Sequence, residues 1–290
     1  MRTATLTLDD GVTIDYREDG DGPPLLLVPG GSGHAGVLDG VIAHLAADHH
    51  VVAMSSRLAS ARPGADPVDH HPKLYADDVH AVIDELFDEP PAVFAFSAGA
   101  ITTLELLSRH PESLRLAVVH EPPVLGLLPE ATSLREAIEA VRAAARTGDM
   151  DEAARLMTAT MTTPGEAPVD FELRHPGDWL DGYADTTPEP PTPQLLELFA
   201  TLGALQPLFL EHVLVPFTTN DVDPDALKAA GSRLVPVAGI DSRGQLPYRA
   251  AAALAAGLGV PLTELPGGHL GPVERPGQFA AALAALVKGQ

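Results

Sequence analysis

A chain of 290 residues, 45% of them hydrophobic, is long enough for one large α/β domain or for a core domain with an inserted subdomain. Its formal net charge of −22 repels phosphate backbones and anionic lipid, so binding to nucleic acid or to a membrane surface is not expected. The sequence has no cysteine, which excludes disulfides, thiolate nucleophiles and cysteine metal sites.

Strands and helices are predicted to alternate over the first 125 residues. Two short β-branched segments at 3–8 and 12–17 flank a turn and predict an N-terminal hairpin. Continuous apolar runs then indicate strands buried on both faces. These strands are predicted at 25–28, 50–54, 91–96 and 114–119, with helices at 35–47, 74–88 and 98–110 and a polar loop at 60–73.

The pattern changes at about residue 126 and returns at about 233. Between these positions the sequence predicts helices at 132–146, 149–160, 194–204 and 224–230, a proline-rich loop at 187–193, and few strands. Beyond them it predicts strands at 234–238 and 261–265 and helices at 247–257 and 276–288. We therefore expect an α/β core domain (1–125 and 233–290) with a mainly parallel, doubly covered sheet, and a helical insertion at 126–232.

Ser97 is the first candidate for chemistry. It directly follows the predicted buried strand 91–96 and precedes a helix, with Ala95 and Gly99 two residues to either side. Only small neighbours fit a sharp strand-to-helix turn that exposes a serine hydroxyl above a sheet. The usual pattern is G-x-S-x-G, and Ala95 replaces its first glycine. The alternative is a serine that caps an ordinary helix.

A serine hydroxyl needs a base to become a good nucleophile. His269 lies in Pro266-Gly267-Gly268-His269, on the loop between the last predicted strand and the last helix. The glycines allow this loop to bend so that the imidazole reaches across the strand ends. We therefore expect His269 to be the base.

The histidine in turn needs an acid to orient it. Asp241 follows the strand 234–238 and is the preferred candidate; its alternative role is that of a turn residue or helix cap. Glu121, in the segment His120-Glu121-Pro122-Pro123, follows the strand 114–119 and is the rival acid.

The oxyanion of a tetrahedral intermediate needs two N–H donors. We expect one from Ala98, at the start of the helix after Ser97, and one from Gly31 in the turn Pro29-Gly30-Gly31. That turn has neither the Lys-Ser/Thr of a P-loop nor a G-x-G-x-x-G that opens a βαβ unit, so nucleotide binding is not expected. His34 is a candidate for contact with substrate, and His120 for a place beneath the site.

The predicted hairpin and four motifs resemble the α/β-hydrolase superfamily. The motifs are PGGSG at 29–33, AFSAGA at 95–100, GIDS at 239–242 and PGGH at 266–269, and the resemblance covers 1–125 and 233–290. The order serine, acid, histidine is that of this family. The insertion resembles the family's cap domain in position and length. Its aromatic residues are expected to form the core of the cap, with one or two lining the pocket: Trp179, Tyr183, Phe199 and Phe209.

The resemblance implies a serine hydrolase that cleaves a small ester, lactone or related acyl substrate through an acyl-enzyme. The alternatives are a biosynthetic lyase, cyclase or acyltransferase on the same fold, and a non-catalytic binder of small molecules. Neither a cofactor nor a metal is needed. The partner is a small-molecule substrate, the oligomeric state is open, and the lack of a signal-like or membrane-spanning run predicts a cytoplasmic protein.

Overall fold

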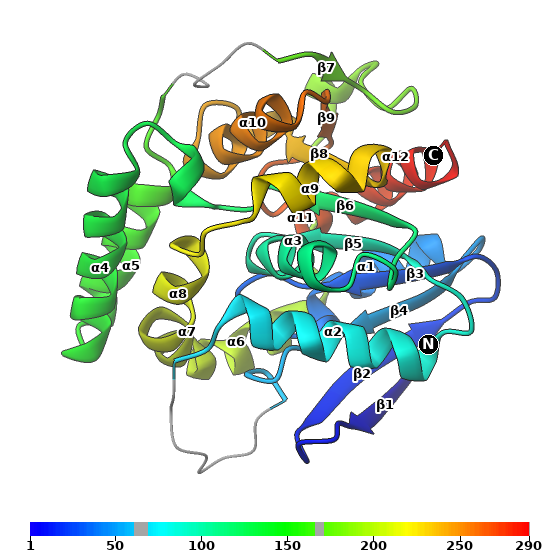
Figure 1. Cartoon of the computed structure of the whole chain (residues 1–290), viewed down its shortest axis with the longest axis horizontal. Coiled ribbons are helices and arrows are strands. Elements are labelled where there is room, and N and C mark those ends of the chain that lie inside the picture. The colour runs from blue at the N-terminus through cyan, green and yellow to red at the C-terminus, as the bar shows by residue number, and fades with distance from the viewer. Residues whose placement is uncertain (61–68, 166–170, 290) are drawn as a thin grey trace.

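A computed structural model describes residues 1–60, 69–165 and 171–289, so most of the predicted polar loop at 60–73 lies outside the described residues. The strands are β1 (Arg2–Thr7), β2 (Thr13–Asp19), β3 (Pro24–Val28), β4 (His50–Met54), β5 (Ala92–Phe96), β6 (Leu116–His120), β7 (Leu173–Arg174), β8 (Leu234–Gly239) and β9 (Leu262–Leu265). The described strands form one sheet in the order β1-β2-β4-β3-β5-β6-β8-β9-β7 (Figure 1).

The sheet is parallel from β4 to β7 and antiparallel only where β1 pairs with β2 and β2 with β4. The helices are α1 (Asp39–Leu45), α2 (Pro72–Leu86), α3 (Ala98–Arg109), α4 (Ala131–Arg146), α5 (Met150–Met161), α6 (Pro193–Leu202), α7 (Gln206–His212), α8 (Leu214–Thr218), α9 (Pro224–Ala230), α10 (Leu246–Leu258), α11 (Gly271–Glu274) and α12 (Pro276–Lys288). The predicted α/β fold with a mainly parallel sheet is confirmed.

Helices cover both faces of the sheet, which explains the continuous apolar runs of its central strands. Successive residues of β3 point to opposite faces: Leu26 packs with residues of α2 and α3, and Leu27 with residues of α1 and α12. Every residue of β3, β5 and β6 is buried. The two cores hold the strand ends in place, and the loops that follow them carry the candidate residues.

The segment 126–232 is mostly helical, as expected, but three of its elements were not predicted. Strand β7 pairs in parallel with β9, so this segment also contributes to the sheet. It has two exposed residues, too few to give a strand pattern. Helices α7 and α8 contain Pro207 and Pro216, which suggested loops; both prolines lie in a first helical turn, where no N–H is needed. Figure 1 shows α4 to α8 beside the core sheet.

The loops after β5, β6, β8 and β9 carry Ser97, Glu121, Asp241 and His269 in that order. Because these strands are parallel, the four loops meet at one edge of the sheet, where ligands bind in folds of this type. Within the described ranges, none of the helices is both long and apolar enough to cross a membrane.

Candidate active site

The backbone of Ser97 has an unusual conformation, with φ 54° and ψ −123°. Such a positive φ is strained for a residue with a side chain and occurs where the surrounding structure enforces it. Close packing enforces it here: an added Cβ on Gly99 would lie 2.6 Å from the Val28 carbonyl oxygen and closer still to that of Pro29. The strand-to-helix turn expected from the sequence is therefore present, with Ser97 partly exposed at its apex.

His269 lies against Ser97, with its Nε2 atom 3.0 Å from the serine Oγ. The loop that brings it there turns at Gly267, which has φ 87°. A Cβ on Gly267 would meet Gly271 Cα at 2.5 Å, so no larger residue fits. The expected contact between the serine and the histidine is thus found, although they are 172 residues apart.

The acid that contacts His269 is Glu121 and not Asp241. The Nδ1 atom of His269 lies 2.8 Å from Glu121 Oε2. The side chain of Asp241 is 47% exposed and accepts a hydrogen bond of 2.8 Å from the Tyr183 hydroxyl. The prediction that Asp241 orients the histidine is therefore corrected in favour of its rival. Both carboxylates follow a strand of the sheet, but β6 is the immediate neighbour of β5, which carries Ser97.

Glu121 is fully buried and held on its second oxygen. Its Oε1 accepts a 2.9 Å hydrogen bond from the Gly239 N–H and another from the Ser242 hydroxyl. Burial opposes the charge of this carboxylate, but the hydrogen bond from His269, together with the other polar groups around it, holds its pKa below the usual range. Glu121 is therefore an ionised acceptor. Since a carboxylate only accepts, His269 must carry its proton on Nδ1, which leaves the Nε2 lone pair for the Ser97 hydroxyl.

Glu121 also has a positive φ, 49°. Neither this turn nor the role of Ser242, which directly follows Asp241, was predicted from the sequence. The serine beside Asp241 thus donates a hydrogen bond to Glu121.

His120 lies beneath the site, as the sequence suggested. It is fully buried, and its ring centroid is 6.4 Å from that of His269. Its Nε2 lies 3.2 Å from the carbonyl oxygen of Gly268 and donates to it. Burial lowers the pKa of His120, so the ring is neutral. The His120 carbonyl oxygen accepts a 2.9 Å hydrogen bond from the Ser97 N–H, which ties β6 to the turn.

The two residues expected to supply oxyanion donors, Ala98 and Gly31, line the same small cavity. Ala98 is the first residue of α3, so its N–H has no acceptor within the helix. Gly31 lies in the turn after β3, which the Gly33 N–H closes by donating to the Gly30 carbonyl at 2.8 Å. The ring of Phe209, from α7, covers Gly31 so closely that an added Cβ would lie 2.5 Å from it.

His34 does not join this group. Its Nδ1 accepts a 3.0 Å hydrogen bond from the Gly36 N–H, so the side chain caps a short helical turn. Burial and the nearby charge of Arg17 lower the pKa of His34. In the part of the chain that the structure describes, no hydrogen bond joins it to Ser97, Glu121 or His269.

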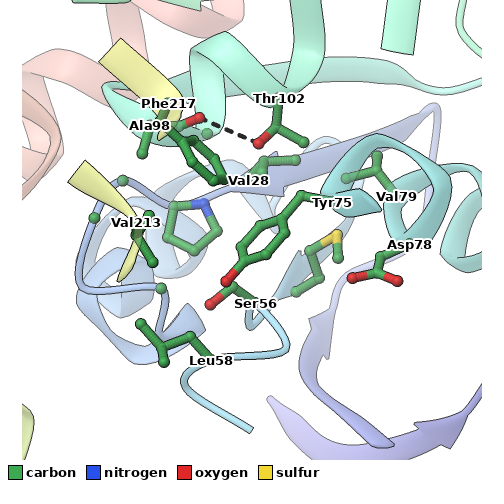
Figure 2. A pocket seen from close by; sticks show the side chains of 16 residues that line it. Val28, Ser56, Leu58, Tyr75, Asp78, Val79, Ala98, Thr102, Val213 and Phe217 are labelled. Atoms are coloured by element: carbon green, nitrogen blue, oxygen red, sulfur yellow. Dashed lines mark hydrogen bonds between the residues drawn. The ribbon is translucent and has the colours of Figure 1, made fainter. Parts of the chain in front are cut away.

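Two hollows lie at this edge of the sheet, one at Gly31 and Ala98 and one at His269. The first is a cavity of about 20 Å³, room for about one water molecule, next to Gly31 and Ala98 (Figure 2). Its side chains are mostly apolar, with the Tyr75 hydroxyl beside Ser56. The second is an open groove of about 430 Å³ at His269, walled by Met157 and Met161 of α5. Among the described residues, no three His, Asp or Glu side chains are arranged to hold a metal ion.

Comparisons with known proteins place this chain in a family. A family model described as the alpha/beta hydrolase family matches residues 25–282. The chain is 29% identical to the uncharacterized hydrolase YraK of Bacillus subtilis over 266 residues, which cover 90% of this chain and 87% of that protein.

Solved structures share the fold. An enol-lactonase from Burkholderia xenovorans superposes with a TM-score of 0.69 at 15% identity and covers 98% of this chain and 100% of its own. A thermophilic esterase from Thermogutta terrifontis superposes with a TM-score of 0.71 at 15% identity and covers 100% and 99%. The chain is an enzyme that belongs to the alpha/beta hydrolase family.

Proposed function

We propose that this enzyme is a serine hydrolase that cleaves a small ester or lactone through an acyl-enzyme, with Ser97, His269 and Glu121 as its triad. The observation that carries the proposal is the continuous chain of hydrogen bonds from Ser97 Oγ to His269 Nε2 at 3.0 Å and from His269 Nδ1 to Glu121 at 2.8 Å. This arrangement supplies a nucleophile, a base and an orienting acid in contact with one another.

In the first step the Ser97 oxygen forms a bond with the substrate carbonyl carbon while His269 Nε2 takes the hydroxyl proton. Glu121 stabilises the resulting imidazolium because its carboxylate is ionised and accepts from Nδ1. The N–H groups of Ala98 and Gly31 donate to the oxyanion. The bond to the leaving oxygen then breaks as His269 returns the proton to it, which leaves the acyl group on Ser97.

In the second step water replaces the alcohol. His269 takes a proton from the water, whose oxygen attacks the acyl carbon. The bond to Ser97 breaks as the proton returns to the serine oxygen, so the enzyme is restored and a carboxylic acid is released. No atom or electron is required beyond those of the ester and one water molecule.

In this proposal, the leaving group and the acyl group of the substrate lie at different hollows. The leaving oxygen must lie near His269 Nε2, so we assign the leaving group to the groove at Met157 and Met161. The acyl side then faces Gly31, Ala98 and the small cavity beside them. Because this cavity is small and Phe209 covers Gly31, the proposal favours a short acyl group. The segment 126–232, which supplies both Phe209 and α5, acts as a cap in this proposal, with 1–125 and 233–290 as the core.

Replacement of the nucleophile tests the proposal. Ser97→Ala is expected to abolish turnover of p-nitrophenyl acetate, with a loss of at least about 10³-fold in kcat. Ser108→Ala is the matched control, because Ser108 lies on the same helix and its hydroxyl donates to the carbonyl oxygen of Leu104, one turn earlier. Circular dichroism confirms that both variants are folded. Wild-type turnover by Ser97→Ala would refute the proposal, and equal losses in both variants would do so as well.

A further inference from the structure

The segment 126–232 contacts the loop that carries His269. The Tyr183 hydroxyl accepts a hydrogen bond from the N–H of Gly267, two residues before His269. The same hydroxyl donates to Asp241 Oδ2 at 2.8 Å. One tyrosine therefore connects the histidine loop to the loop after β8, and it comes from neither of them.

Gly267 is held from its other side as well. Its carbonyl oxygen accepts a 3.0 Å hydrogen bond from the Asp241 N–H. Tyr183 and Asp241 thus bind both backbone polar groups of Gly267, the residue at which the loop turns with a φ of 87°. Only Gly268 lies between Gly267 and His269 in the sequence. A shift of Gly267 would therefore move His269 relative to Ser97.

Tyr183 is itself fixed by its surroundings. The guanidinium carbon of Arg275 lies 4.5 Å from the centre of its ring, and the Trp179 ring meets it edge-on with centroids 5.1 Å apart. Arg275 also donates to Thr186 Oγ1 at 2.7 Å, which anchors the chain just after Tyr183. Burial and the hydrogen bond to Asp241 raise the pKa of Tyr183 to about 12, so the hydroxyl keeps its proton for Asp241.

We propose that Tyr183 is a positioning residue that holds His269 at Ser97, with Asp241 as its anchor. This inference rests on the proposed function, because its effect on turnover requires His269 to be the base. It also gives a role to Asp241, which is not a member of the proposed triad. Small displacements of a catalytic group are costly: a misplacement of about 1 Å can reduce the rate by about 10²-fold.

The test compares two tyrosine-to-phenylalanine variants. Tyr183→Phe keeps the ring between Arg275 and Trp179 and removes only the hydroxyl. Its kcat for p-nitrophenyl acetate is expected to fall by about 10-fold with KM changed less than about twofold, because a loosened base affects the chemical step and not substrate binding. The control is Tyr248→Phe, which removes a hydroxyl that donates to Glu264 at 2.8 Å in another part of the core.

Asp241 gives a second pair of variants, in which Tyr183 itself is not replaced. Asp241→Asn keeps an oxygen acceptor for the Tyr183 hydroxyl, whereas Asp241→Ala removes it. The inference predicts that Asp241→Asn loses clearly less activity than Asp241→Ala. If Asp241→Asn instead loses as much as Glu121→Gln, the inference is overturned.

Proton NMR tests the position of His269 without a measurement of turnover. The His269 Nδ1 proton, in its bond to Glu121, is expected to give a downfield resonance that broadens or disappears in Tyr183→Phe and persists in Tyr248→Phe. The inference would be overturned if Tyr183→Phe kept the wild-type kcat and an unchanged resonance. Inactivity of Ser97→Ala in the same assay would show that the proposed function still holds. Turnover by Ser97→Ala would instead overturn the proposed function, and the resonance would still report on Tyr183.

Discussion

His269 Nδ1 lies 2.8 Å from the carboxylate of Glu121, a residue that follows β6 and not β8. This contact spans 148 residues of sequence, and both partners are in loops at the same edge of the sheet. The buried carboxylate accepts hydrogen bonds from the Gly239 N–H, at the end of β8, and from the Ser242 hydroxyl, in the loop that follows. The β8 loop thus supports the acid although it does not supply it.

Glu121→Gln is expected to reduce kcat by about 10²- to 10⁴-fold, because a neutral amide neither stabilises the imidazolium nor fixes the tautomer of His269. Steady-state kinetics on p-nitrophenyl acetate measure the loss. Asp241→Asn, assayed in parallel, is expected to lose far less. The reverse order of the two variants would restore Asp241 as the triad acid.

Gly99→Ala is expected to lower the free energy of unfolding by about 1–3 kcal/mol, because the added methyl group collides with the carbonyl oxygens of Val28 and Pro29. The collision also separates α3 from the turn of Gly31, so kcat falls as well. Gly257→Ala in α10 is the control: nothing lies within 4 Å of its added Cβ, and it should stabilise the helix by about 0.5–1 kcal/mol. Urea unfolding measures both changes. If the free energy of unfolding changed in the same direction in Gly99→Ala and Gly257→Ala, the result would contradict this explanation.

Phe209→Ala is expected to admit longer acyl groups, because the Phe209 ring covers Gly31 beside the proposed oxyanion donors. The ratio of kcat/KM for p-nitrophenyl hexanoate to that for the acetate should rise by about 10-fold, the gain expected when a pocket accommodates a few more methylene groups. Phe199→Ala in α6 is a suitable control because Phe199 is 42% exposed. An unchanged ratio in Phe209→Ala would show that this ring does not limit the acyl side.

Acidification is expected to destabilise the protein through His120. Burial holds its folded-state pKa below its ordinary value of 6.5, so the unfolded chain takes up a proton first as the pH falls. The stabilisation is therefore complete above about pH 6.5 and is lost below it, with a slope of at most about 1.4 kcal/mol per pH unit. Unfolding free energies measured between pH 7 and 5 should fall less steeply in His120→Phe.

Glu121 acts in a lower pH range, because its folded-state pKa is held below its ordinary value of 4.5. Its contribution is present above that value and is lost as the pH falls through its lowered folded-state pKa. The two groups can therefore be separated, and equal slopes for His120→Phe and the wild-type protein between pH 7 and 5 would contradict the assignment to His120.

The sequence was sufficient to predict the central strands, because β3, β5 and β6 are buried on both faces and form unbroken apolar runs. It also predicted Ser97 and His269, which lie in short motifs next to such strands. Strand β7 was missed because two exposed residues carry no periodicity. Helices α7 and α8 were missed because proline suggests a loop unless its place in the first turn is known.

The acid could not be chosen from the sequence because Glu121 and Asp241 satisfy the same local criterion, a carboxylate just after a strand. The difference lies in tertiary structure: β6 lies between β5 and β8, and the positive φ of Glu121 belongs to a turn that no residue pattern announced. The hydrogen bonds from Gly239 and Ser242 to Glu121 join positions 118 and 121 residues apart. Such pairings depend on the fold as a whole.

The most direct test of the central claim is labelling with a fluorophosphonate, followed by mass spectrometry of the intact protein and of its peptides. The account predicts one adduct per chain, located on Ser97, which is absent in Ser97→Ala and forms more slowly in Glu121→Gln than in Asp241→Asn. An adduct on another residue, or none on the folded wild-type protein, would contradict the claim that Ser97 is a nucleophile activated by His269 and Glu121.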